Sequence, residues 1–94
     1  MPSSTTSNKF YYVYILLSKE DSNKYIGYTS DLRKRIKEHN EGKCFSTKYR
    51  RPLILIYYEA CLSKDDAKRR ERYLKTTGGR RFLAKRLRNY LFDK

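Results

Sequence analysis

The 94-residue sequence has no tryptophan, one histidine, one methionine, two prolines and two cysteines. Cys44 and Cys61 stand alone, without a Cys-x-x-Cys pair or a histidine pair nearby, so the sequence indicates neither a zinc site nor a disulfide framework. We expect both to be reduced thiols of a cytoplasmic protein. No apolar run approaches the roughly 20 residues that cross a bilayer, and we therefore expect no membrane partner.

The start of the sequence also lacks the apolar stretch of a secretory signal. Residues 1–9 are polar and rich in serine and threonine, so we expect a flexible tail followed by a single domain over residues 10–94. Aromatic residues make up 15% of the chain, and the apolar residues cluster in runs that can build a core. This composition excludes a chain that is disordered throughout.

Acidic residues are few, because 10 Asp and Glu stand against 23 Lys and Arg, a formal net charge of +13. Nucleic acid is the expected partner, since cations that neutralise phosphates release condensed counterions. The candidate phosphate contacts lie after residue 42 and in the C-terminal third: Lys43, Lys48, Arg50, Arg51, Lys68, Arg69, Arg72, Arg80, Arg81, Lys85 and Arg88. For any single cation of the C-terminal helices, a solvated helical face is the commoner explanation. Charge alone also fits a ribosome-associated or other binding protein without chemistry.

Two apolar runs, at residues 10–17 and 53–60, predict strands that are covered on both faces. Residues 24–29 resume the first pattern after a short polar loop, which predicts a β-hairpin. A helix of about three turns should follow, with Ser30 as its N-cap and Gly42 as its terminator.

The C-terminal third predicts helices. Ser63 followed by Asp66 resembles a capping box that opens one helix, and the Thr-Thr-Gly-Gly segment at residues 76–79 should end it. A last amphipathic helix then extends to Leu91. The order β-β-α-β-α-α predicts an α+β fold, a small three-stranded and mainly antiparallel sheet flanked by three helices.

Charged side chains interrupt the apolar stripes of two predicted helices. Arg35 and His39 share a helical face with Leu32, and Glu71 lies three residues before Leu74 on an inward stripe. Burying an ion costs several kcal/mol unless the ion is paired. The pattern therefore fits either a structural Arg35–Glu71 salt bridge or a functional site, and it leaves both open.

Two strand triplets, Tyr12-Val13-Tyr14 and Tyr25-Ile26-Gly27, resemble the paired strand motifs of the GIY-YIG endonuclease domain. Tyr25 follows Tyr14 by 11 positions, which is within the spacing of that family. Tyr12 stands where the family usually has glycine. Taken singly, Tyr12, Tyr14 and Tyr25 would be ordinary core residues of strands.

The resemblance continues beyond the strands and covers residues 10–91. Arg35 follows the YIG tyrosine by ten positions and His39 comes one turn later, as in the family's first helix. Residues 67–71, Ala-Lys-Arg-Arg-Glu, resemble the helix that carries the family's metal-binding glutamate. The sequence is most similar to the small stand-alone bacterial members and to the N-terminal nuclease domain of the excision-repair endonuclease (excinuclease).

This resemblance implies a Mg²⁺-dependent DNA endonuclease, structure-selective or weakly sequence-selective, in DNA repair or recombination. It implies Tyr14 as the general base, Tyr25 as the residue that positions water or phosphate, and Glu71 as the ligand of Mg²⁺, for which Mn²⁺ would substitute. Arg35 would bind the scissile phosphate bidentately. A free phenol titrates near 10, so either Arg35 and the metal depress the pKa of Tyr14 or His39 accepts its proton.

Several alternatives stay open at this point. A non-catalytic module that binds DNA or RNA could retain the nuclease fold, and RNA could replace DNA as the substrate. Many family nucleases also have an asparagine in the C-terminal segment, where Asn89 is the candidate in this sequence.

Overall fold

The computed structural model describes residues 9–92, so most of the predicted tail at residues 1–9 lies outside the described residues. The elements in chain order are β1 (Tyr11–Ser18), β2 (Lys24–Thr29), α1 (Leu32–Asn40), β3 (Leu53–Cys61), α2 (Lys64–Leu74), α3 (Thr77–Arg86) and α4 (Arg88–Phe92). Among the described residues, no helix is both long and apolar enough to cross a membrane.

The three strands form one antiparallel sheet in the order β2-β1-β3. The central strand β1 is buried along most of its length, as its nearly continuous apolar run predicts. Tyr14 lies between Gly27 of β2 and Tyr58 of β3 in the register. The pairing of β1 with β3 shifts by one residue between Ile15 and Leu16, and such a bulge increases the local twist.

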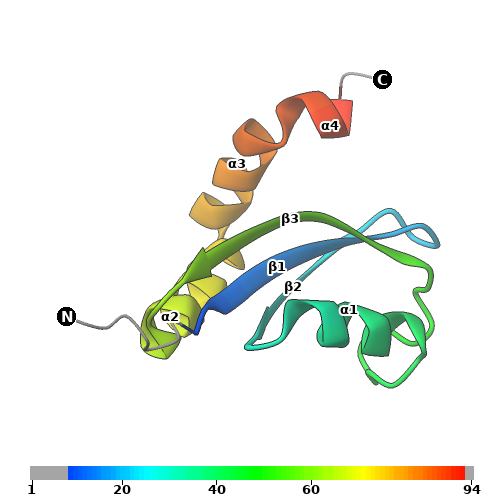
Figure 1. Ribbon diagram of the computed structural model, residues 1–94. Helices are drawn as coiled ribbons and strands as arrows, with labels where there is room; N and C mark the ends of the chain where they lie inside the picture. The colour runs from blue at the N-terminus through cyan, green and yellow to red at the C-terminus, as the bar shows by residue number, and fades with distance from the viewer. Residues whose placement is uncertain (1–8, 93–94) are drawn as a thin grey trace.

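Helices cover both faces of the sheet, with α1 on one face and α2 and α3 on the other (Figure 1). The strands feed alternate side chains to the two layers. The α1 layer contains Tyr14, Leu16, Leu53, Leu32 and Ile36. The opposite layer contains Val13, Ile15, Ile26, Ala67, Leu74, Leu83 and Leu87. The predicted α+β fold with a three-stranded sheet is confirmed.

Three predicted helix boundaries are corrected. The N-cap of α1 is Asp31 rather than Ser30, because the Asp31 carboxylate accepts from the Lys34 amide at 3.2 Å. The Thr-Thr-Gly-Gly segment does follow α2, but it also opens α3, since the Thr76 hydroxyl accepts from the Gly79 amide at 3.1 Å. The last helix is divided at Leu87, whose backbone (φ −108°, ψ 22°) leaves the helical region while its side chain stays in the core. Residues 9–92 therefore contain four helices where three are predicted.

Candidate active site

Tyr14 reaches across β2 because its neighbour there has no side chain. A Cβ atom at Gly27 would collide with the ring and hydroxyl of Tyr14. The glycine of the Tyr25-Ile26-Gly27 triplet therefore leaves the room that the Tyr14 ring occupies on the α1 side of the sheet. This contact joins the two strand motifs in this chain, because Tyr14 needs the space that Gly27 leaves.

His39, in the last turn of α1, joins Tyr14 to the loop that follows the helix. Its Nε2 lies 2.8 Å from the Tyr14 hydroxyl, and its Nδ1 lies 2.8 Å from the Thr47 hydroxyl. The thiol of Cys44 lies 3.9 Å from the same Nε2. Tyr14 is 1% exposed and His39 is 0% exposed, so water is excluded from the hydrogen bond between them.

Tyr25 and Arg35 form the open side of this cluster. The Tyr25 ring centroid lies 5.0 Å from that of His39 and 6.3 Å from that of Tyr14. Arg35 is half-buried, and its Nη1 donates to Glu38 at 3.2 Å. Both side chains are partly accessible, so they are the members of the cluster that a bound phosphate can touch first.

Burial sets the protonation states of the two buried members of the cluster, Tyr14 and His39. It raises the pKa of Tyr14 to about 12, although the Arg35 guanidinium acts in the opposite direction. It also lowers the pKa of His39 to about 4, an effect to which Arg35 adds. At neutral pH the phenol is protonated and the imidazole is neutral. The lowering effect of Arg35 is therefore too small to bring the pKa of Tyr14 below that of a free phenol, and His39 Nε2 lies within hydrogen-bond distance of its proton.

Glu71 stands apart from this cluster. It lies on α2, whose residues Ala67 and Leu74 pack on the face of the sheet opposite α1. Its carboxylate pairs with Lys75 Nζ at 2.9 Å. Within residues 9–92, no hydrogen bond or ion pair joins Glu71 to the tyrosines, Arg35 or His39. The Arg35–Glu71 salt bridge that the sequence left open is not formed. Arg35 pairs with Glu38 of α1, and Glu71 pairs with Lys75, the C-cap residue of α2.

The predicted phosphate contacts are distributed over both sides of the sheet. Lys43, Lys48, Arg50 and Arg51 lie in the loop after α1, whereas Lys68, Arg69, Arg72, Arg80, Arg81 and Lys85 lie on α2 and α3, and Arg88 lies on α4. Some already have partners. Arg50 pairs with Asp21 at 2.8 Å, Arg69 pairs with Asp66, and Lys48 lies over the rings of Phe45 and Tyr49.

Sequence reasoning missed Thr47, which holds the second nitrogen of His39. Its loop is anchored to the β1–β2 hairpin by Arg50, which donates to Asp21 and to the carbonyl of Asn23 and accepts from the Ser18 hydroxyl at 2.7 Å. A hydrogen bond from a helix end to a loop eight residues later leaves no periodic signal in the sequence. Asn89 lies in α4 and lines a small hollow with its helical neighbours.

Comparison with known proteins decides the family. The family model described as the GIY-YIG catalytic domain matches residues 10–91. The chain belongs to the GIY-YIG family. The resemblance predicted from the strand motifs is confirmed, and this GIY-YIG chain carries a nuclease-type domain, which implies a nucleic-acid substrate.

The GIY-YIG chain is also similar to small bacterial proteins. The UPF0213 protein YazA of Bacillus subtilis (strain 168) is 45% identical over 71 residues, which cover 74% of this chain and 69% of YazA. The UPF0213 protein SH2523 of Staphylococcus haemolyticus is 48% identical over 67 residues, which cover 70% of this chain and 80% of that protein. The solution NMR structure of the UPF0213 protein BH0048 from Bacillus halodurans matches with a TM-score of 0.52 and 38% identity, over 81% of this chain and 83% of that one.

Proposed function

We propose that this protein is a Mg²⁺-dependent endonuclease that hydrolyses DNA phosphodiester bonds, with structure selectivity or weak sequence selectivity, in DNA repair or recombination. The observation that carries the proposal is the convergence of Tyr14, Tyr25, Arg35 and His39 on the α1 face of the sheet. Arg35 is always protonated and binds the scissile phosphate. Tyr25 positions the phosphate or the attacking water.

We assign the removal of the proton from the attacking water to Tyr14 and His39. The Tyr14 hydroxyl donates to Nε2 of His39, and Nδ1–H of His39 donates to the Thr47 hydroxyl. As the water attacks phosphorus, Tyr14 takes a proton from the water and passes its own to His39. The bond to the leaving oxygen breaks, and that oxygen departs as an alkoxide that takes a proton from solvent water. Arg35 favours loss of the Tyr14 proton, because it lowers the pKa of the phenol, but it also lowers the pKa of His39 and so opposes the imidazolium that this transfer forms.

The proposed metal has a sparse donor set. Within residues 9–92, no group of three or more His, Cys, Asp or Glu side chains could hold a metal ion. Mg²⁺ commonly keeps several waters and takes one or two carboxylates plus substrate phosphates, so a single carboxylate such as Glu71 could hold the ion only together with substrate. The place of Glu71 on α2, across the sheet from Arg35, does not by itself fit an ion that also contacts the phosphate at Arg35. A bound ion would stabilise charge on the phosphate oxygens. The role of Glu71 rests on the family resemblance alone.

A nucleic-acid-binding module without turnover is the second candidate. The complete burial of Tyr14 and His39 favours it, because a substrate cannot reach these two groups without a local movement.

Cleavage assays distinguish the two candidates. Labelled duplex, flap and four-way-junction DNA, and a matched RNA, are incubated with Mg²⁺, Mn²⁺ or EDTA. We expect cleavage of DNA with either metal and none with EDTA. Arg35→Ala should lower the rate about 10²-fold or more, the scale for losing one donor to the transition state, while binding stays nearly intact.

The controls separate catalysis from folding. Lys37→Ala removes a cation from an exposed side of the same helix and should cleave at the unaltered rate. Glu71→Gln should abolish metal-dependent cleavage. Binding without cleavage of any substrate under all conditions would establish the non-catalytic module, and retained activity in Arg35→Ala would exclude the proposed phosphate contact.

A further inference from the structure

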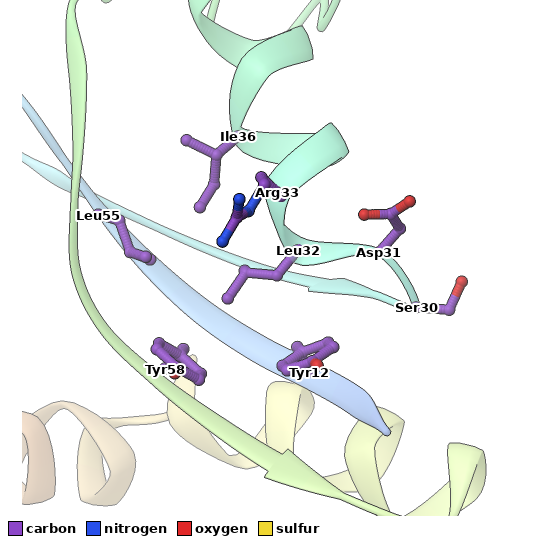
Figure 2. A pocket seen from close by; sticks show the side chains of 8 residues that line it. All are labelled: Tyr12, Ser30, Asp31, Leu32, Arg33, Ile36, Leu55 and Tyr58. Carbon is purple, nitrogen blue, oxygen red and sulfur yellow. The ribbon is translucent and has the colours of Figure 1, made fainter. Parts of the chain in front are cut away.

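A hollow of about 480 Å³ lies between α1 and the sheet (Figure 2). The rings of Tyr12 from β1 and Tyr58 from β3 form its sheet side, and Leu32 and Ile36 of α1 form its helix side. This volume is within the range of small-ligand pockets, about 300–1,000 Å³. The hollow does not include Tyr14, Tyr25 or His39, so it is distinct from the cluster described above.

The two tyrosines on the sheet side suit a flat aromatic ligand. Their ring centroids lie 5.9 Å apart with an interplanar angle of 61°, and Tyr58 is 51% exposed. Aromatic rings presented on neighbouring strands of an antiparallel sheet are a surface on which proteins stack unpaired nucleobases. Leu32 and Ile36 add the apolar wall that would cover the other face of such a base.

The charges around the hollow favour a base rather than a phosphate inside it. Asp31 lines the hollow, and its negative charge at the rim disfavours an anion there. Arg33 also lines the hollow, and it forms no ion pair within residues 9–92. Its guanidinium is therefore available to the phosphate attached to a bound base or to the face of the base itself.

The strand register places the hollow next to Tyr14, because one of its tyrosines is the cross-strand partner of Tyr14. Tyr58 lies directly opposite Tyr14 in the pairing of β1 with β3, and directly opposite residues have Cα atoms about 5 Å apart. Leu32 and Ile36 of the hollow also pack with Tyr14 on the α1 side of the sheet, so the hollow and the cluster are neighbours there and one bound strand can contact both.

We propose that this hollow binds one unpaired nucleobase of the strand that is cleaved, so the substrate is single-stranded beside the scissile bond. The inference rests on the proposed nuclease function and adds the class of substrate to it. A duplex would have to release a base from its stack to fill the hollow, at a cost of a few kcal/mol, and would bind less well.

Binding in EDTA tests the hollow without requiring turnover. The probe is a single-stranded DNA oligonucleotide that contains 2-aminopurine, compared with the same sequence as a duplex and with the free mononucleotide. We expect the full-length protein to quench the fluorescence of the single strand and to bind it more tightly than the duplex. Tyr58→Ala should weaken this binding about tenfold, and Tyr58→Phe should restore it.

Two further variants complete the test. Tyr73→Ala removes another exposed tyrosine, on α2, and should leave single-strand binding unchanged. Arg33→Ala should weaken binding without altering the circular dichroism spectrum, which keeps the test valid if Tyr58→Ala does not fold. Unchanged affinity and quenching in both Tyr58→Ala and Arg33→Ala would overturn the proposal, as would binding of the mononucleotide as tight as that of the oligonucleotide.

The binding test of the hollow and the cleavage test of the proposed nuclease can fail independently of each other. Quenching that depends on Tyr58 in a protein that cleaves nothing would support the hollow and overturn the nuclease. Metal-dependent cleavage with the same single-strand to duplex ratio in wild type and Tyr58→Ala would support the nuclease and overturn the hollow.

Discussion

At the scale of single residues, the Tyr14–His39 pair shows that burial outweighs a neighbouring cation. Arg35 lowers the pKa of Tyr14, yet removal from water raises it further, because a buried tyrosinate loses its hydration. The same removal from water keeps His39 neutral. At neutral pH the protein therefore holds a proton on the Tyr14 phenol, with Nε2 of the neutral imidazole 2.8 Å away.

We expect the free energy of unfolding to fall as the pH drops from 7 to 4.5. The pKa of His39 in the folded protein, about 4, lies below the 6.5 of an unfolded histidine, so the unfolded chain binds the proton first. The stability contributed by His39 is complete above pH 6.5 and is lost towards pH 4, by about 2–3 kcal/mol over this interval. Urea unfolding of wild type and of His39→Asn at both pH values isolates the effect, and an equal pH dependence in the two proteins would contradict it.

Residue identity and spacing predicted part of this cluster. Arg35 and His39 interrupt the apolar stripe that carries Leu32 and Ile36, and the structure places all four on the side of α1 that meets the sheet. Thr47 was not predictable in this way, because its contact with His39 depends on the path of the loop.

At the scale of elements, the strands were predictable because they are apolar runs bounded by polar turns, whereas the helix ends were not. Ser30 and Asp31 are both preferred N-cap residues, so only the backbone decides between them. The residues around Thr76 are a second case in which the sequence alone does not locate a helix end. A Thr-Thr-Gly-Gly segment is typical of a helix end, but here its first hydroxyl caps the next helix.

Gly78 and Gly79, in the first turn of α3, provide a matched pair of substitutions that tests the packing of the α2–α3 corner. A Cβ atom at Gly79 would overlap the carbonyl oxygen of Tyr73 and the Cα atom of Leu74, whereas at Gly78 the nearest atom is the Tyr73 hydroxyl at 3.6 Å. Gly79→Ala should lower the free energy of unfolding by about 2 kcal/mol or more. Gly78→Ala should raise it by about 0.5 kcal/mol, because alanine loses less entropy in a helix.

Chemical denaturation of the two variants measures both effects. Equal stabilities of Gly78→Ala and Gly79→Ala would show that the corner is not packed as closely as the structure describes.

At the scale of the whole molecule, the protein is elongated, with principal extents of 48, 30 and 23 Å and a radius of gyration of 14.7 Å. A compact domain of about 100 residues has a radius near 13 Å. Figure 1 shows that α3, which packs against the core through Leu83, leads to α4, which projects beyond the sheet. The net charge of +13 is thus spread over a long body, with cations on both sides of the sheet.

Because the cluster lies on the α1 side of the sheet, we expect cations on that side to contribute more to cleavage than cations on the α3 side. Lys43→Ala with Lys48→Ala, in the loop that also carries Thr47, should make the slope of log K against log salt less negative by up to about 2. It should also lower kcat/KM for cleavage. Arg81→Ala with Lys85→Ala removes the same charge from α3 and should affect cleavage less.

Fluorescence anisotropy at several salt concentrations, with cleavage measured in parallel, compares the two double variants. A larger loss of cleavage in the α3 variant would place the substrate on the other face of the sheet.

The bridge from the β1–β2 hairpin to the loop after α1 restricts where this chain can be altered. Hairpin tips are ordinarily the most permissive sites for insertions and fusions. Here Asp21 and Asn23 hold Arg50, and the Arg50 amide in turn donates to the carbonyl of Thr47. A peptide tag inserted into this turn would disturb the contacts of Arg50 and, through them, the loop that positions Thr47 beside the His39 imidazole. Affinity tags and reporter domains should therefore be placed elsewhere on the molecule.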